Sequence, residues 1–451
     1  MLIAAIEKCA AILPCVISRK VALPTISWSL TSRNYFNCPP TMSSLHANNQ
    51  CFPPASFFYY GSLRKFSSSL ESQSVGITPV VASVHDHGSR IEVRAKNWPN
   101  SLHIPHVWLR DHCRCAQCYD PKTFQCNFDV ATMPLNIRPS KIALLQDELH
   151  LTWPDGHESR YTLQFLWHHS HGGHTSHARD TRVAWSAKTF PPLHQISVPE
   201  STISGPGLRK VFTLLEQYGV ALITEVSPDL DSTIAVSNHI GPTLKTFYGD
   251  TWVVRANGER ADAAYTRVAL GAHTDGTYFT QAPRVQVFHM VEAAPEGGET
   301  LLVDGLRVAQ VMQTKHPDAY DFFSTHAIPG QYIGDGQQQY ALLKTFIHHP
   351  VTGAFQQFRY NLYDRAPLST LSVGAVEQYY RHLQTLASVV TDQDAGVWLK
   401  LQPGSVLFVD NWRVLHGRAA FSGPRCFLGC YISNDDYIST LRTVMQLNVM
   451  K

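Results

Sequence analysis

Residues 272–279 read Ala272-His273-Thr274-Asp275-Gly276-Thr277-Tyr278-Phe279, and this stretch sets a histidine and an aspartate two positions apart. In an extended strand, residues i and i+2 point to the same face. His273 and Asp275 can therefore present an imidazole and a carboxylate to one point. Such a pair suits Fe(II) when a second histidine completes a set of two histidines and one carboxylate, which leaves coordination positions open.

We expect His416 to be that second histidine. An apolar run over residues 405–409 reads as a buried strand that leads toward it, and Gly417 and Arg418 follow it. A His-x-Asp pair is common by chance, but the pair joined to a distal His-Gly-Arg after a strand is much more specific. The alternative is that all three residues are hydrogen-bonded members of the core or of turns.

Length and composition limit the number of domains and the class of protein that this sequence can encode. The chain has 451 residues, enough for two domains and a leader, and 44% of them are hydrophobic. A net charge of +2 gives no general reason to expect a nucleic-acid partner. Ten cysteines in a chain of this length do not suggest a secreted disulfide framework. An uninterrupted apolar run of about 20 residues is missing from the sequence, so we expect no membrane span.

Residues 1–75 have the composition of an organelle transit peptide. Glu7 is the only acidic residue before Glu71, while lysines, arginines and many serines recur. We therefore expect a mitochondrial leader here, and a merely disordered tail is the alternative.

A small β-rich domain is expected over residues 76–170. Residues 90–94 alternate as a half-buried strand, and residues 142–153 read as a hairpin with Leu149, Leu151 and Trp153 on its inner face. Three cysteines, Cys113, Cys115 and Cys118, lie close together in this domain, at a spacing that suggests a metal ligand set.

Residues 171–203 are expected to form a linker, which opens with histidines, glycines and serines and shows no apolar periodicity. A metal-binding histidine tract is the alternative interpretation. The second domain then spans residues 204–451. We expect strands near residues 220–226, 284–292 and 300–303 and helices over 208–218, 308–323 and 373–390. Many strands with a few helices outside them predict a mainly β fold of the sandwich or jelly-roll type, with the metal site inside.

At this point the residues carry a family resemblance. His273-x-Asp275 with the distal His416-Gly417-Arg418 resembles the Fe(II)- and 2-oxoglutarate-dependent dioxygenases of the taurine dioxygenase type. Residues 297–300 and 303–305 also look like that group. The cysteine cluster and residues 248–249, 264–266 and 410–413 narrow the resemblance to the carnitine-synthesis pair, γ-butyrobetaine dioxygenase and trimethyllysine dioxygenase. It covers the chain from about residue 80 onward. It implies a double-stranded β-helix, or jelly roll, preceded by a small zinc-binding β domain.

The resemblance implies that Cys113, Cys115, Cys118 and His157 hold structural zinc. Three thiolates and one imidazole would complete a closed tetrahedral site, which suits a domain with a thin core. His112 competes with His157, although neighbouring residues of an extended chain point apart. Cys126 matches no position of the pattern, and free buried thiols remain the alternative.

The resemblance also implies 2-oxoglutarate as cosubstrate. Arg425 matches the family's cation for the far carboxylate, because a guanidinium can hold a carboxylate through two hydrogen bonds, and Thr300 would add a hydroxyl donor. Arg418 is closer to His416 in sequence, and a surface or supporting role is the alternative for it.

The implied substrate carries a trimethylammonium group, which aromatic faces recognise by cation–π attraction. The positions that match the family's aromatic cage are Tyr248, Trp252, Tyr265 and Tyr431. Asp262 matches an acidic position of the trimethyllysine enzymes, where it would attract the substrate's α-ammonium. Residues 359–365 and the mitochondrial leader point the same way, whereas Gly276 departs from the threonine common there. We therefore expect trimethyllysine hydroxylation, with γ-butyrobetaine hydroxylation as the alternative.

Further expectations follow from the resemblance alone. They are O2 as co-reactant, ascorbate as reductant, a mitochondrial matrix location and a homodimer. A different class of function stays open at this point, namely a zinc-stabilised binding module on a degenerate jelly roll. The intact candidate metal ligands and carboxylate clamp argue against it, and no basic stripe accompanies the cysteines.

Overall fold

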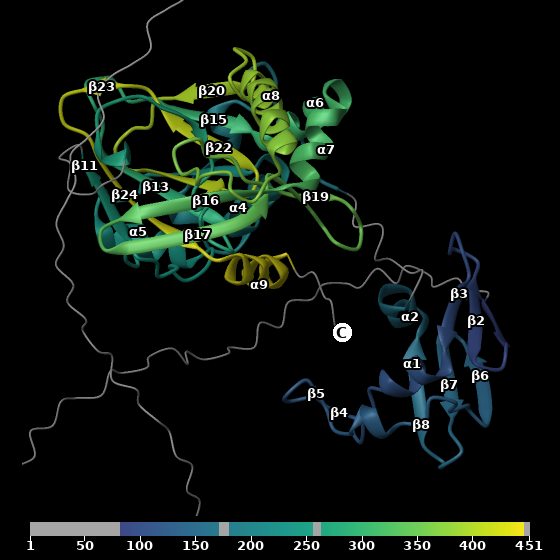
Figure 1. The fold of residues 1–451 in the computed structure, drawn as a ribbon. Coiled ribbons are helices and arrows are strands. Elements are labelled where there is room, and N and C mark those ends of the chain that lie inside the picture. Colours follow the sequence, from purple (N-terminus) through teal and green to yellow (C-terminus); the bar gives the residue numbers. More distant parts are fainter. Residues whose placement is uncertain (1–81, 171–179, 256–262, 446–451) are drawn as a thin grey trace, which may run out of the picture. The chain divides into compact units, whose positions relative to one another are not determined.

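The computed structural model describes residues 82–170, 180–255 and 263–445, and within them the chain is mainly sheet with flanking helices (Figure 1). Two folded parts, residues 82–170 and residues 180–445, are considered one at a time. The predicted leader over 1–75, three histidines of the His-rich tract (His171, His174 and His177) and Asp262 lie outside the described residues.

The first part contains two three-stranded antiparallel sheets and a short hairpin. The strands of the sheets are β1 (Ala82–Asp86), β2 (Arg90–Ala95), β3 (Leu102–Pro105), β6 (Lys141–Leu145), β7 (Glu148–Thr152) and β8 (Glu158–Thr162). The hairpin consists of β4 (Tyr119–Asp120) and β5 (Gln125–Cys126). The helices are α1 (His106–Asp111), η1 (Val130–Thr132) and α2 (Leu163–His169). The predicted strand near residues 90–94 and the predicted hairpin are both confirmed.

One small core joins the two sheets of this part. Ile91, Val93 and Ile104 pack in the same buried cluster as Leu149 and Leu151. Trp153 is also buried, and its indole N–H donates to Ser159 Oγ at 2.8 Å. The predicted inner face of the hairpin is therefore confirmed. Alternation of apolar and polar residues along β7 is what directs Leu149 and Leu151 to this core.

The second part is built on a six-stranded and a four-stranded sheet. In spatial order, the larger sheet consists of β11 (Trp252–Arg255), β24 (Cys426–Ile432), β13 (Val285–Glu292), β21 (Ser405–Asp410), β10 (Val220–Thr224) and β9 (Ser197–Pro199). The smaller sheet consists of β12 (Leu270–His273), β22 (Val414–Arg418), β15 (Thr300–Asp304) and β20 (Gly396–Leu399).

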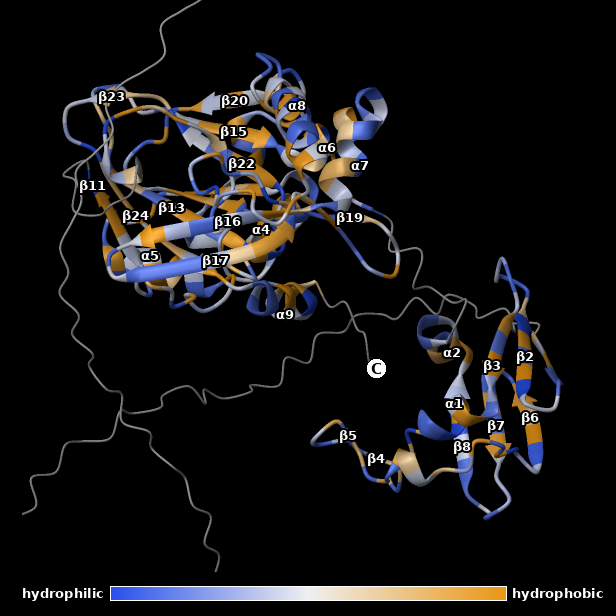
Figure 2. Cartoon of the chain, viewed as in Figure 1, coloured by the Kyte–Doolittle hydropathy of each residue, from blue (hydrophilic) through white to orange (hydrophobic). Residues whose placement is uncertain are grey.

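The largest apolar core lies between these sheets. Val287 and Phe408 of the larger sheet belong to the same buried cluster as Leu302 and Val414 of the smaller one. Strands such as β10 and β21 are apolar over nearly their whole length because both of their faces are covered. Figure 2 shows β24 of the same sheet largely in the hydrophobic colour. The buried run 405–409 predicted from sequence is β21.

The described residues of the second part also form helices, most of which lie outside the two sheets (Figure 1). They are α3 (Leu193–Ile196), η3 (Glu200–Thr202), α4 (Pro206–Tyr218), α5 (Leu230–Asn238), η4 (Ala263–Tyr265), α6 (Gly305–Lys315), α7 (Pro317–Thr325), α8 (Val373–Val390) and α9 (Asn434–Val444). The predicted stop of α4 is confirmed, because Gly219 adopts a left-handed φ of 75° there. The minor hairpins are β14 (Glu296–Gly297) with β23 (Phe421–Ser422), β16 (Ala327–Gly334) with β17 (Gln337–Lys344), and β18 (Phe346–His348) with β19 (Phe355–Phe358).

A second core forms where α6, α7 and α8 stack beside the smaller sheet (Figure 1). The helix predicted over 308–323 is wrong as one element, because two helices meet at His316. Pro317 has no backbone N–H to continue the hydrogen-bond ladder, and it begins α7 instead. The predicted helix over 373–390 matches α8 at both ends, with Tyr379, Leu386 and Val390 buried.

The linker predicted over 171–203 is too long. Trp185 is only 1% exposed, and its backbone N–H donates to Asp304 Oδ2 at 2.9 Å. Residues 197–199 form β9, which pairs in parallel with β10. The packing of this segment could not be predicted from the sequence, because the segment has no apolar periodicity. It is held by isolated contacts such as that of Trp185.

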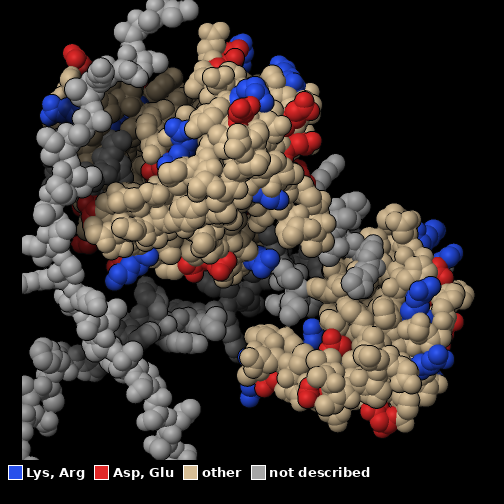
Figure 3. All heavy atoms as spheres, viewed as in Figure 1, with Lys and Arg blue, Asp and Glu red and all other residues tan. Residues whose placement is uncertain are grey.

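Charged side chains of both signs are interspersed on the face that Figure 3 shows. Among the described residues, no helix combines the length and the apolar character needed to cross a lipid bilayer.

Candidate active site

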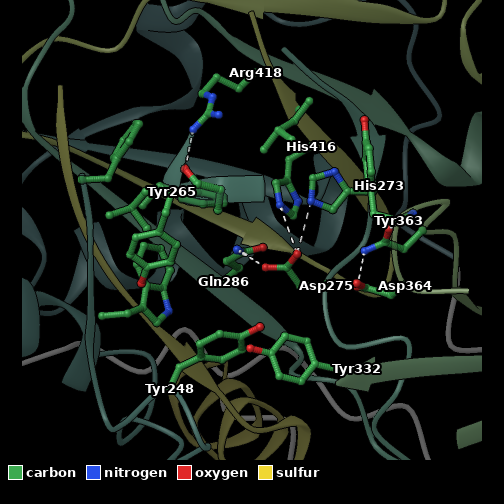
Figure 4. A pocket seen from close by; sticks show the side chains of 18 of the residues that line it. Tyr248, Tyr265, His273, Asp275, Gln286, Tyr332, Tyr363, Asp364, His416 and Arg418 are labelled. Atoms are coloured by element: carbon green, nitrogen blue, oxygen red, sulfur yellow. Dashed lines mark hydrogen bonds and ion pairs between the residues drawn. The ribbon is translucent and has the colours of Figure 1, made fainter. Parts of the chain in front are cut away.

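A cavity of about 410 Å³ opens between the two sheets of the second part, and Figure 4 shows 18 of the side chains that line it. Its wall includes Gln286 and Phe288 of β13, Thr300 of β15 and His416 of β22. Because alternate residues of a strand point to opposite faces, the inward-facing positions of both sheets meet in this space. The cavity is partly polar and partly aromatic.

The structure brings His273, Asp275 and His416 together at one end of this cavity. His273 ends β12 and pairs in register with His416 of β22, so both imidazoles leave neighbouring strands side by side. Asp275 Oδ1 lies 3.4 Å from His273 Nε2 and 3.6 Å from His416 Nε2. The three side chains form one of two groups of potential metal ligands among the described residues.

Hydrogen bonds fix the orientation of these groups. His273 Nδ1 lies 2.8 Å from the carbonyl oxygen of Gly271, which leaves Nε2 directed at Asp275. Burial, followed by the charge of His273, lowers the pKa of His416 to about 3. A neutral imidazole at His416 is the form that binds a metal.

The second oxygen of Asp275 has its own partners. Gln286 Nε2 donates to Asp275 Oδ2 at 2.5 Å, and the hydroxyl of Tyr431 donates to it at 2.8 Å. Asn411 holds the backbone, since its Oδ1 accepts from Asp275 N at 2.8 Å and its Nδ2 donates to Asp275 O at 3.0 Å. Asp275 is therefore fixed so that only Oδ1 faces both histidines.

Arg425 and Arg418 both line the cavity but have different surroundings. Arg418 donates to three backbone carbonyls, those of Ala264, Thr266 and Val268, at 2.8–2.9 Å. Arg425 lies over the rings of Phe421 and Phe427, and its buried Nε has no hydrogen-bond partner within the described part of the chain. Burial, followed by the charge of Arg418, lowers the pKa of Arg425 to about 9, so it is still a cation at neutral pH.

The four predicted cage residues, Tyr248, Trp252, Tyr265 and Tyr431, all line the cavity. Trp252 packs against Gly429 so closely that a Cβ there would overlap the indole, and its ring lies 6.0 Å from that of Tyr431. Tyr431 differs from a simple wall residue, because its hydroxyl also bonds Asp275. Asp262, the fifth predicted substrate residue, lies outside the described residues.

Two more tyrosines extend this aromatic wall and were not predicted as cage residues. The hydroxyls of Tyr248 and Tyr278 are 3.0 Å apart, and the ring of Tyr332 lies 5.4 Å from that of Tyr278. Figure 4 shows Tyr248 and Tyr332 converging below Asp275. Tyr332 belongs to the hairpin of β16 and β17, and only the folded structure shows that it lines the cavity.

The cysteine cluster of the first part is the other group of potential metal ligands among the described residues. His157 Nε2 lies 3.3 Å from Cys113 Sγ, 3.6 Å from Cys115 Sγ and 3.5 Å from Cys118 Sγ. These separations match the roughly 3.5 Å edge that bond lengths of about 2.3 Å to sulfur and 2.0–2.1 Å to nitrogen give in a tetrahedral zinc site. His112 instead lies against Trp108, and Cys126 is exposed.

Two family models match this chain. The family model "Taurine catabolism dioxygenase TauD, TfdA family" matches residues 184–431, and "Gamma-butyrobetaine hydroxylase-like, N-terminal" matches residues 83–167. Among solved structures, a putative alpha-ketoglutarate-dependent taurine dioxygenase from Burkholderia xenovorans aligns with a TM-score of 0.40 at 18% identity, covering 49% of this chain and 81% of that one.

Curated relatives narrow the family to which the chain belongs. The mitochondrial trimethyllysine dioxygenase of Gallus gallus is 36% identical over 362 residues, which cover 79% of this chain and 86% of the relative. The trimethyllysine dioxygenase of Neurospora crassa is 30% identical, with 75% of this chain and 80% of the relative covered. The chain therefore belongs to the TauD, TfdA dioxygenase family and, within it, to the trimethyllysine dioxygenases.

Proposed function

We propose that this chain hydroxylates Nε-trimethyllysine at its β-carbon, giving 3-hydroxy-Nε-trimethyllysine, the first step of carnitine biosynthesis. The observation that carries the proposal is the convergence of His273, Asp275 and His416 at the end of a cavity with an aromatic wall. In the reaction, one atom of O2 enters the C–H bond as a hydroxyl. The other oxidises 2-oxoglutarate to succinate and CO2.

Strand order supports a jelly roll as the scaffold. The eight strands β11, β12, β13, β15, β20, β21, β22 and β24 divide equally between the two sheets. Successive strands cross from one sheet to the other at most steps, which is the path of a double-stranded β-helix. This path brings β12 and β22 side by side, although the two iron-binding histidines that we propose lie 143 positions apart (416 minus 273).

The ligand atoms suit Fe(II). His273 and His416 offer Nε2 and Asp275 offers Oδ1, and a two-histidine, one-carboxylate set leaves open positions for other ligands. Bound Fe(II), with 2-oxoglutarate and O2, would supply the oxidising chemistry. The protein's part is to hold these three atoms in place, and the hydrogen bonds of Gln286 and Tyr431 keep the carboxylate from turning.

Arg425 suits the far carboxylate of 2-oxoglutarate. The buried Nε of Arg425 has no partner among the described residues, and a buried guanidinium is costly unless an anion pairs with it. The far carboxylate of 2-oxoglutarate would supply that anion. Thr300 lines the same cavity and is the proposed hydroxyl donor. Arg418 has a different role in this proposal, because its carbonyl contacts hold the segment that carries Tyr265.

The aromatic wall suits a trimethylammonium group, which cannot donate a hydrogen bond. Each favourable contact between such a cation and a ring contributes about 0.5–2 kcal/mol. We assign Tyr248, Trp252, Tyr265 and Tyr431 to this cage, with Tyr278 and Tyr332 as a supporting layer. At the substrate's other end, Asp262 remains our proposed partner of the α-ammonium. Holding both ends would present one methylene to the metal centre.

The zinc site of the first part is a second element of the proposal. Cys113, Cys115, Cys118 and His157 have the separations of a closed tetrahedral site, with no position for a substrate. Burial lowers the pKa of His157 and so favours its neutral, ligating form. The zinc would therefore stabilise the domain and take no part in hydroxylation.

Cellular context completes the proposal. Relatives named as mitochondrial enzymes support a mitochondrial location, and we propose the matrix as the compartment and residues 1–75 as the transit peptide. Ascorbate as reductant and a homodimer as the assembled state are proposed on family likeness.

A substrate panel tests the proposal. Purified protein is supplied with Fe(II), 2-oxoglutarate and ascorbate and then with trimethyllysine, unmethylated lysine or γ-butyrobetaine. Trimethyllysine should give the highest kcat/KM, measured as hydroxylated product by mass spectrometry. Lysine should be poor, because its strongly hydrated ammonium gains little from an aromatic cage. A preference for γ-butyrobetaine would overturn the assignment in favour of the related enzyme.

A further inference from the structure

A second, smaller cavity is lined in part by the loop that follows Asp275. Its volume is about 40 Å³, above the roughly 10–15 Å³ that one water-sized particle requires. Its lining includes Thr277, Pro329 and Arg359, together with side chains of α7 and α8. The proposed hydroxylation chemistry uses none of these residues.

Arg359 is the most unusual group in this wall. It is 6% exposed, and its Nη2 donates to the carbonyl oxygens of Thr277 and Phe279. Its Nε has no hydrogen-bond partner in the described part of the chain, and no carboxylate there forms an ion pair with it. Burial lowers its pKa to about 10, which still leaves a cation at neutral pH. A buried cation without a counter-charge is costly.

Thr277 adds an independent observation. Its Oγ1 is also buried and without a hydrogen-bond partner among the described residues, and Thr277 lines the same cavity as Arg359. A guanidinium N–H donates and a hydroxyl can donate, so one acceptor placed between them would satisfy both groups. Asp364 and Arg365 also line the cavity, and with Arg359 their formal charges add to one positive charge.

We propose that this cavity is a binding site for a small monatomic anion, chloride under physiological conditions, held by Arg359 Nε and Thr277 Oγ1. A water molecule could accept both hydrogen bonds but would leave the buried charge of Arg359 uncompensated. Since Arg359 also holds the carbonyls of Thr277 and Phe279, the anion stabilises the loop that follows Asp275.

Bromide substitution tests the site directly. Crystals of the full chain grown in sodium bromide should give an anomalous density peak in this cavity, within contact distance of Arg359 Nε and Thr277 Oγ1. Ordinary water density without anomalous signal at that position would overturn the proposal.

Solution measurements provide a second test. At constant ionic strength, the Tm of the wild type should be higher in sodium chloride than in sodium methanesulfonate, whose anion is larger than chloride. Thr277→Val keeps the side-chain shape, removes the hydroxyl and should reduce this difference by half or more. The matched control is Ser324→Ala, which removes a buried unpartnered hydroxyl whose residue does not line the cavity. Equal Tm values for the wild type in both salts, or an undiminished difference in Thr277→Val, would contradict the proposal.

Discussion

At Asp275 the two carboxylate oxygens have different surroundings, and the difference would let this residue bind the proposed metal through one oxygen while the other holds its orientation. Oδ1 faces the two imidazoles, while Oδ2 accepts hydrogen bonds from Gln286 and Tyr431. Burial opposes its charge, but His416 and His273 together with Tyr431 hold the pKa of Asp275 well below its usual range. The carboxylate is therefore ionised and oriented before any metal arrives.

Tyr431→Phe tests this orientation. The change keeps the ring in the aromatic wall and removes only the hydroxyl that donates to Asp275 Oδ2. Loss of such a supporting hydrogen bond weakens metal binding by about 10–100-fold. We expect the dissociation constant for Fe(II), measured by anaerobic titration, to rise by that factor.

The matched control is Tyr437→Phe, another buried tyrosine whose hydroxyl donates to a carboxylate, Glu216, at 2.7 Å. It should leave Fe(II) affinity unchanged, because Tyr437 does not line the cavity. Equal effects of the two substitutions would contradict a specific role for Tyr431.

Asp262 is tested by comparing two substrates. A charge-assisted hydrogen bond to the α-ammonium of trimethyllysine would contribute roughly 1.5–3 kcal/mol. Asp262→Asn should therefore lower kcat/KM on trimethyllysine by about tenfold to a hundredfold. On γ-butyrobetaine, which has no ammonium at that end, the change should be small. Equal losses on both substrates would mean that Asp262 supports the fold and does not bind the α-ammonium.

Residue types and spacing were enough to predict His273, Asp275 and His416 as one group, whereas Arg425 and the four aromatic residues were predicted from the family resemblance. The structure brings His273, Asp275 and His416 together as expected, with Arg425 and the four aromatic residues in the same cavity wall. Gln286 and Asn411 were missed, because their contacts with Asp275 depend on how distant strands align. The one weak signal for Gln286 is that it is a polar residue inside the apolar start of β13, where it is buried.

Among the elements, the junction around Asp304 and Arg413 joins segments from four places in the chain. Arg413 Nε donates to Asp304 Oδ1 at 2.9 Å and its Nη2 donates to Oδ2 at 3.0 Å. Arg413 also donates to the carbonyls of Val183 and Gln217, while Asp304 caps α6. These contacts tie the segment before α3, the end of α4 and the start of α6 to β22.

Asp304→Asn is expected to lower the free energy of unfolding by about 3–5 kcal/mol, because it leaves the charge of Arg413 buried and unpaired. Denaturant titration of the purified protein measures this change. Asp394→Asn, which breaks the exposed Lys188–Asp394 pair, serves as control and should hardly move the unfolding midpoint. A similar midpoint for both variants would contradict the role of the buried pair.

Elements with a strong periodic pattern were predictable, and elements held by single contacts were not. The face of α8 repeats apolar residues over five turns, so both of its ends follow from the sequence. Pro317 carried the signal that α6 and α7 are separate helices, but the apolar spacing runs on across it. Trp185 and β9 gave no periodic signal, because one buried ring and three paired residues fix that segment.

For the molecule as a whole, our proposal makes the two folded parts depend on metal in different ways. The first part has a small core. A metal bound by the three cysteines of residues 113–118 and by His157 would connect two segments that are distant in the sequence. Its stability should therefore depend on zinc, whereas turnover should depend on iron in the second part.

Cys118→Ser tests the zinc site. The variant should bind less than one zinc ion per chain, measured by elemental analysis. The midpoint of the thermal transition that unfolds the first part should fall by roughly 10 °C or more. About 1 kcal/mol shifts Tm by about 4–8 °C in a domain of this size. Cys126→Ser, which alters an exposed cysteine of the same part, should keep both zinc and Tm. Full zinc content in Cys118→Ser would rule the assignment out.

The central claim is that the His273, Asp275 and His416 centre directs oxygen into trimethyllysine, and an isotope measurement tests it most directly. Wild-type protein is given Fe(II), 2-oxoglutarate and trimethyllysine under 18O2, and both products are analysed by mass spectrometry. We expect one 18O atom in the hydroxyl group at the β-carbon and one in succinate, with both products lost in Asp275→Ala. Succinate formed without labelled hydroxytrimethyllysine, a hydroxyl on another carbon, or an active Asp275→Ala variant would contradict the claim.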